Sequence, residues 1–103
     1  MIRHLVLLRF TAEASERTRA AISDDFAALP GRIPLVRALE RGVNTSPEGL
    51  DRGYTHAFLL SFDTEADRDA YLPHPEHQAF VSRLKPWLAD VLVIDYETEP
   101  GTR

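Results

Sequence analysis

The hydrophobic positions alternate with polar ones in four parts of the chain, and each alternating part predicts a β-strand. Residues 2–10 alternate so that the middle of the strand is apolar on both faces. Residues 54–62 form the clearest predicted strand. Residues 35–43 are more polar, which favours a strand at the edge of a sheet. Residues 91–97 predict a final strand.

The first helical pattern runs from Ser15 to Leu29, where an apolar residue recurs every three or four positions. Ser15 is placed to cap that helix, and the Pro-Gly pair at positions 30–31 is placed to end it. Asn, Pro and Gly are concentrated in residues 44–53. This composition predicts a long loop between the second and third strands.

Two prolines divide a second helical region into two helices. Asp63 or Thr64 can cap a short helix that Pro73 ends. Pro75 occupies the first position of a further helix, where proline is tolerated because no backbone donor is needed there. We expect this helix to run over about residues 74–88, with its last turn kinked or frayed by a second internal proline.

The predicted order is strand, helix, strand, strand, two helices, strand. It matches the split β-α-β plan of ferredoxin-like folds, an α+β class. Right-handed crossovers then place all the helices on one face of a four-stranded antiparallel sheet. One domain over residues 1–97 accounts for the whole pattern, and residues 98–103 predict a frayed C-terminal tail.

The sheet face opposite the helices is predicted to be apolar as well. Burying five large apolar side chains there contributes at most about 1.5 to 3 kcal/mol each, whereas a bare patch of that size favours aggregation. We therefore expect a second copy of the chain to cover this face in a symmetric homodimer. The five side chains are Leu5, Leu7, Leu59, Leu92 and Ile94.

Composition and motifs narrow the possible functions. The net charge of −4 and the scattered basic residues argue against a nucleic-acid partner. The absence of cysteine excludes disulfides, thiolate metal sites and thiol nucleophiles. The apolar run at the N-terminus is interrupted by Arg3, His4 and Arg9, so we expect no signal peptide or membrane span, and a cytoplasmic protein. No P-loop or dinucleotide motif is present, so no cofactor is expected.

The segment "YLPHPEHQAF", residues 71–80, holds the strongest candidates for chemistry. His77 lies on the apolar stripe of the last helix, in its first turn, where burial and the helix dipole favour the neutral imidazole that a general base requires. Tyr71 ends the preceding helix, and the proline corner can turn its phenol toward His77. Two alternatives stay open, namely a core histidine bonded to the backbone and a tyrosine that only packs its ring.

The other three histidines support weaker predictions. His74 is expected to cap the last helix or to lie exposed. Its i, i+3 spacing with His77 suits a pair of metal ligands, but without Cys or an HExxH pattern we expect no metal. His4 and His56 lie in strand interiors, and neighbouring first and third strands would bring them near each other.

Four segments together resemble the stress-responsive A/B barrel (Dabb) family: "IRHLVLLRF", "RGVNTSPEGLDRGYTHAFLLSF", "AYLPHPEHQAF" and "VLVIDYE". The resemblance covers residues 1–97 and implies a dimeric α+β barrel of ferredoxin-like subunits. One family member closes a linear polyketide by an aldol condensation, with a histidine and a tyrosine at the positions of His77 and Tyr71. Phe26 stands where that enzyme has a pocket tyrosine, and Leu88 where it has a tryptophan.

The resemblance implies a small apolar pocket for a carbonyl-containing or aromatic metabolite. His77 would remove a proton next to the carbonyl and Tyr71 would bind the developing oxyanion, in an aldol-type cyclisation that needs no cofactor. A non-catalytic dimeric stress or ligand-binding protein is the main alternative, and a cofactor-free monooxygenase is a third. The side chains expected to bind the substrate are His4, Val6, Leu8, Phe26, His56, Phe58, Phe80 and Leu88.

Overall fold

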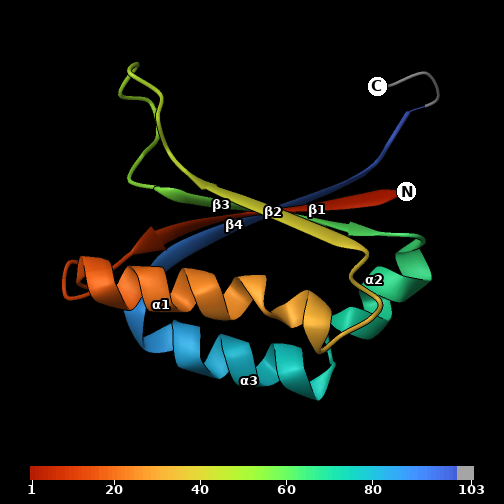
Figure 1. Cartoon of the computed structure of the whole chain (residues 1–103). Helices are drawn as coiled ribbons and strands as arrows, with labels where there is room; N and C mark the ends of the chain where they lie inside the picture. Colours follow the sequence, from red (N-terminus) through yellow and green to blue (C-terminus); the bar gives the residue numbers. More distant parts are fainter. Residues whose placement is uncertain (100–103) are drawn as a thin grey trace.

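The computed structural model describes residues 1–99, and its helices and strands follow the predicted order (Figure 1). Two single turns of 3₁₀-helix, η1 and η2, follow the first and last α-helices. The elements are β1 (Ile2–Phe10), α1 (Glu16–Ala27), η1 (Leu29–Gly31), β2 (Ala38–Val43), β3 (His56–Phe62), α2 (Glu65–Tyr71), α3 (Pro75–Leu84), η2 (Lys85–Trp87) and β4 (Leu88–Glu97).

The four strands form one antiparallel sheet in the order β2-β3-β1-β4. All three α-helices lie on the same face of this sheet, and the loop between β2 and β3 projects on the other side, as does the end of β4 (Figure 1). The predicted ferredoxin-like α+β fold is therefore confirmed. None of the helices in the described part of the chain is long and apolar enough to cross a membrane.

The alternation along β1 decides which side chains enter the core. Its even-numbered residues point to the helices and are buried, whereas its odd-numbered residues point to the other face. Val6 is paired with Phe58 on one side and Val93 on the other, so the same row continues across the sheet. The helices and the segment after η1 complete the core with buried apolar residues, which include Ile22, Phe26, Leu29, Ile33, Tyr71, Phe80 and Leu84.

The helix starts follow the predicted capping chemistry. The side chain of Ser15 accepts a hydrogen bond from the backbone N–H of Thr18 at 3.1 Å. We expect Ser15→Ala to lower the free energy of unfolding by about 1 kcal/mol, because one N–H of the first turn loses its partner. Urea unfolding measures this change. Ser82→Ala, at an exposed position within α3, is the matched control and should change stability by less than about 0.5 kcal/mol; equal losses in both variants would contradict the capping role.

The C-terminal part of the chain departs from three predictions. The last α-helix ends at Leu84 rather than near Leu88, because Pro86 has no N–H and its ring excludes the continuing α-helical turn. Leu88 instead begins β4, three residues earlier than predicted, and pairs with Phe10. Thr98 is not frayed, since its N–H donates to the carbonyl of Met1 at 3.0 Å. The rest of the predicted tail, residues 100–103, lies outside the described residues.

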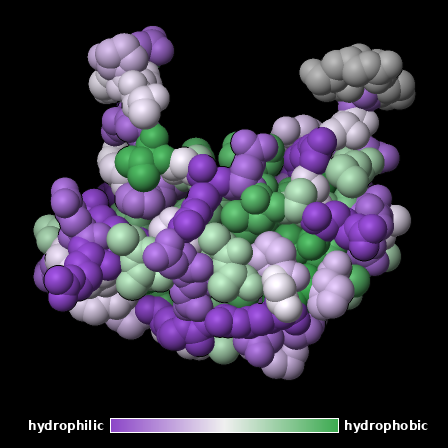
Figure 2. Space-filling model, viewed as in Figure 1, coloured by the Kyte–Doolittle hydropathy of each residue, from purple (hydrophilic) through white to green (hydrophobic). Residues whose placement is uncertain are grey.

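The face opposite the helices carries the predicted apolar side chains. In the sheet register Leu5 pairs with both Leu59 and Ile94, and Leu7 pairs with Leu92, so all five lie on one face. Leu92 and Ile94 are 43 % and 56 % exposed in the single chain. Figure 2 shows hydrophobic residues in the centre of the molecule, below the projecting loop between β2 and β3. No helix within residues 1–99 covers this face.

Candidate functional site

A cavity of about 440 Å³ lies between the helices α2 and α3 and the β1–β4 side of the sheet. Most of its wall is apolar, and it includes six of the predicted substrate-binding residues, His4, Val6, Leu8, Phe26, Phe80 and Leu88. Its polar side chains are His4, Arg68, Asp69, Tyr71, His77 and Asp95. A volume of this size suits a small organic ligand.

Tyr71 and His77 meet across the proline corner, as predicted. Their ring centroids are 4.4 Å apart and their planes are inclined by 45°. Tyr71 is fully buried, and its hydroxyl has no hydrogen-bond partner among residues 1–99. Burial raises the pKa of the Tyr71 phenol above its ordinary value of 10. The phenol therefore stays protonated at neutral pH and can donate a hydrogen bond to a ligand in the cavity.

The hydrogen bond that His77 makes to the backbone identifies its reactive nitrogen. Its Nδ1 lies 2.7 Å from the carbonyl oxygen of Leu72. Since a carbonyl oxygen can only accept, Nδ1 must carry the hydrogen, and Nε2 of the neutral ring is left with a free lone pair. Burial lowers the pKa of His77, against the opposing effect of the Leu72 carbonyl, and the nearby His4 and His74 lower it further. A neutral His77 can accept a proton through Nε2.

The lowered pKa of His77 makes stability depend on pH. The unfolded chain binds a proton at His77 near pH 6.5, whereas the folded chain binds it only at lower pH. Stability is therefore greater above this window and is lost as pH falls through it. We expect the melting temperature to fall as the pH is lowered from about 7 to about 5. His77→Gln should make the melting temperature depend less steeply on pH over this range. An NMR titration in which His77 has a pKa above its ordinary value would contradict this.

His4 belongs to a chain of charged and polar side chains at one end of the cavity. Its Nδ1 lies 2.7 Å from Oδ1 of Asp95, directly across the β1–β4 pair. The other oxygen of Asp95 accepts a hydrogen bond from Arg68 at 2.9 Å, and Nε of Arg68 donates to Asp69 at 2.9 Å. The ring of His4 also packs edge-on against Tyr71, at 6.0 Å between centroids. His4, Asp95 and Arg68 thus form one connected group beside Tyr71.

Arg68 and Asp95 are cavity residues that the sequence analysis missed. Two signals pointed to them. Asp95 continues the inward row of Val91 and Val93 on β4, where a carboxylate requires a partner. Arg68 precedes Tyr71 by three positions on α2 and therefore shares its helix face.

His56 and Phe58 lie outside the cavity. In the antiparallel register His4 pairs with Leu60 and His56 pairs with Leu8. The two histidines are therefore separated by four positions along the strands, about 13 Å. The prediction that they lie near each other is wrong, because neighbouring strands bring residues together only at matching register. Phe58 is a buried core residue.

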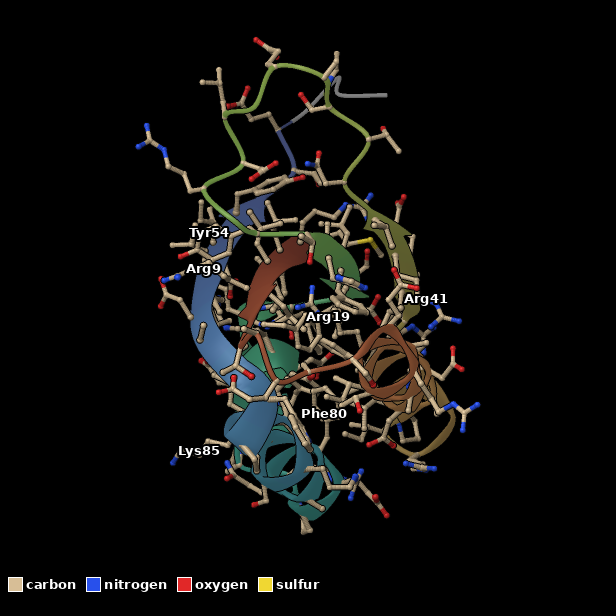
Figure 3. The ribbon with its side chains drawn as sticks, turned by 90° about the vertical axis from the view of Figure 1, so that its left-hand side faces the viewer. Arg9, Arg19, Arg41, Tyr54, Phe80 and Lys85 are labelled. Atoms are coloured by element: carbon tan, nitrogen blue, oxygen red, sulfur yellow. The ribbon has the colours of Figure 1, made fainter. Side chains whose placement is uncertain are left out.

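His56 instead borders a groove of about 600 Å³ between α1 and the β2 edge of the sheet. Its ring packs edge-on against Phe10, at 5.1 Å between centroids, and its Nδ1 lies 2.8 Å from the hydroxyl of Thr55. Figure 3 shows Arg19 and Arg41, which line the same groove, beside α1. Burial and the charge of Arg19 lower the pKa of His56.

Three aromatic rings connect the core to the floor of the cavity. Phe26 on α1 stacks on Phe58, with ring centroids 4.3 Å apart. Phe26 also contacts Phe80 on α3 at 4.7 Å, and Figure 3 shows Phe80 between the two helices. These contacts hold α1 and α3 together over the sheet, so the apolar end of the cavity is fixed by the core itself.

Comparison with protein families agrees with the fold. The model of the stress responsive A/B barrel domain, Dabb, matches residues 2–98. The chain belongs to the Dabb family. It is 31 % identical over 96 residues to the stress-response A/B barrel domain-containing protein HS1 of Arabidopsis thaliana, covering 93 % of this chain and 88 % of the relative. It is also 24 % identical over 95 residues to olivetolic acid cyclase of Cannabis sativa, covering 92 % and 94 %.

Solved structures of Dabb-like proteins have the same fold. The Arabidopsis thaliana protein At3g17210 has a TM-score of 0.92 and 29 % identity, with both chains fully covered. A dimeric ferredoxin-like protein of unknown function from Thermobifida fusca has a TM-score of 0.79 and 28 % identity, covering 94 % of this chain and 90 % of that one. Several structural neighbours of the chain are dimeric ferredoxin-like proteins, which supports a homodimer here.

Proposed function

We propose that this Dabb protein is a homodimer in which each subunit binds an apolar, carbonyl-bearing or aromatic metabolite between Tyr71 and His77. The observation that carries the proposal is the buried hydroxyl of Tyr71, a residue of the cavity wall, which has no hydrogen-bond partner among residues 1–99. Leaving such a group unsatisfied costs about 1–3 kcal/mol. A carbonyl oxygen of a bound ligand would accept the missing hydrogen bond and recover that cost.

The sheet face opposite the helices is the proposed dimer interface. It combines exposed apolar side chains of β4 with the leucines of β1 and β3. Two such faces, packed about a twofold axis, would remove them from water in both subunits at once. The helix-side cavity would stay accessible in this arrangement, because it lies on the other side of the sheet.

The proposed reaction is an aldol-type cyclisation by proton transfer alone. Nε2 of His77 removes a proton from the carbon next to a carbonyl while the Tyr71 hydroxyl donates to the carbonyl oxygen, which stabilises the enolate. The enolate carbon then adds to a second carbonyl carbon of the same molecule and forms the new C–C bond. The resulting alkoxide takes up the proton held by His77. The likeness to olivetolic acid cyclase supports a cyclisation.

A second candidate is a non-catalytic protein that binds the same kind of ligand. The rings of Tyr71 and His77 are in contact, but no hydrogen bond joins the Tyr71 hydroxyl to His77. Only a ligand would therefore link that hydroxyl to the imidazole. Such a cavity can store or sense a metabolite without transforming it. The likeness to stress-response proteins supports this alternative.

Proton exchange distinguishes the two candidates without knowledge of the natural substrate. Acetophenone, dissolved in D₂O with the dimer, has methyl protons next to its carbonyl. We expect the protein to accelerate their replacement by deuterium, which NMR follows directly. Binding without acceleration would favour the non-catalytic candidate. Absence of both binding and acceleration would contradict the proposed ligand site.

A further inference from the structure

Every charged side chain on the wall of the cavity is already held by an opposite charge. Arg68 donates through one terminal nitrogen to Asp95 and through Nε to Asp69, both at 2.9 Å. The remaining oxygen of Asp95 lies 2.7 Å from Nδ1 of His4. The side chains of Arg68 and Asp95 are only 20 % and 22 % exposed, so water screens this cluster incompletely.

We infer that the cavity accepts neutral carbonyl compounds and rejects carboxylates, and that the two carboxylates paired with Arg68, Asp69 and Asp95, set this specificity. The inference rests on the proposed function, because it takes the same cavity as the ligand site. The charged cluster would select ligands by their charge, whereas the Tyr71–His77 pair by itself does not distinguish neutral from anionic ligands.

The charges of the cluster exclude a carboxylate ligand in either state of His4. With His4 neutral, one guanidinium faces the two carboxylates of Asp69 and Asp95, which leaves one excess negative charge. With His4 protonated, the cluster is neutral and His4 is paired with Asp95. His77 also lines the cavity and is neutral above its lowered pKa. At about pH 8 no unpaired cation therefore faces the cavity, so a carboxylate entering it would lose its hydration without gaining a counter-charge.

A neutral carbonyl compound would enter the cavity without the cost of removing a charge from water. Its apolar body would contact the apolar wall and the rings of Phe26 and Phe80. Its oxygen would need one donor, which the Tyr71 hydroxyl supplies. No charge has to leave water, so the hydrophobic contribution of the contact is kept in full.

The test compares acetophenone with benzoate, which have nearly the same shape but differ in charge at about pH 8. Binding to the wild-type dimer is followed by the shifts of backbone NMR signals of Tyr71 and His77. We expect benzoate to bind at least about tenfold more weakly than acetophenone. In Asp69→Asn/Asp95→Asn, where Arg68 loses both carboxylates, benzoate should bind at least about tenfold more tightly than to the wild type.

Two further variants keep the test decisive. Asp63→Asn makes the same type of charge change outside the cavity, at a residue paired with Arg37, and should leave both affinities unchanged. Asp69→Asn alone changes an exposed residue and leaves the pair of His4 and Asp95 in place, so it should fold even if the double variant does not. It should strengthen benzoate binding by about twofold to fivefold.

The outcomes separate this inference from the proposed function. Equal binding of benzoate and acetophenone to the wild type would overturn the charge selectivity and leave the ligand site in place. Unchanged benzoate affinity in both carboxylate variants would overturn the assignment to Asp95 and Asp69. If neither compound shifts the signals of Tyr71 and His77, the cavity is not the ligand site and both proposals fail.

Discussion

Replacing Leu59 with aspartate will dissociate the dimer. Leu59 lies on β3 in the middle of the exposed sheet face, directly opposite Leu5. In the dimer a carboxylate at this position would be buried against the apolar side chains of the partner without a counter-charge. We expect the dissociation constant to rise at least about a hundredfold, equivalent to about 2.7 kcal/mol. Analytical ultracentrifugation over a range of concentrations measures this change.

The control replaces an apolar residue that is exposed but lies away from that face. Val43, at the end of the edge strand β2, is 61 % exposed and pairs with His56 on the helix side. Val43→Asp should leave the dimer intact. The proposed interface would be wrong if the unmodified protein were a stable, folded monomer, or if Leu59→Asp dimerised as tightly as the wild type.

Replacing Tyr71 with phenylalanine will abolish most of the acceleration of proton exchange while leaving the fold intact. The hydroxyl is the only atom removed, and it makes no hydrogen bond within residues 1–99, so the folded protein should lose no stability. We expect the exchange rate of acetophenone to fall about 10²- to 10⁴-fold, because the enolate loses its hydrogen-bond donor. His77→Ala should have an effect of similar size, because it removes the base. NMR measures the rate and urea unfolding the stability.

Tyr54→Phe is the matched control for this result. Tyr54 donates its hydroxyl to Asp90 and does not line the cavity. Its replacement removes the same atom elsewhere and should leave proton exchange unchanged. If Tyr71→Phe exchanged acetophenone as fast as the wild type does, the phenol would have no catalytic role. A loss caused equally by Tyr54→Phe would point to a general effect on the fold.

Local patterns were sufficient to predict the elements and the faces of the sheet. The period of two in β1 assigns Val6 to the helix side and Leu5 to the opposite side, and the register confirms both. The prolines at 73 and 75 predict the corner between α2 and α3. This corner brings the ring centroids of Tyr71 and His77 to 4.4 Å from each other. These features depend on residues close together in sequence, so no knowledge of the packing was needed.

The charged end of the cavity could not be predicted in the same way. His4 and Asp95 meet because β1 and β4, at opposite ends of the chain, pair in a particular register. Arg68 reaches Asp95 only because α2 packs over that part of the sheet. The register also separates His4 from His56, although both occupy inward rows. Such contacts depend on how strands and helices are placed relative to one another, which periodicity does not specify.

Intermolecular NOEs between acetophenone and the methyl-labelled wild-type dimer test the proposed ligand site most directly. Contacts from the ligand to the methyl groups of Val6, Leu8 and Leu84 are expected, because these side chains line the cavity with Tyr71 and His77. Contacts confined to Val43, which lines the groove beside His56, would place the ligand elsewhere and contradict the site assigned to this protein.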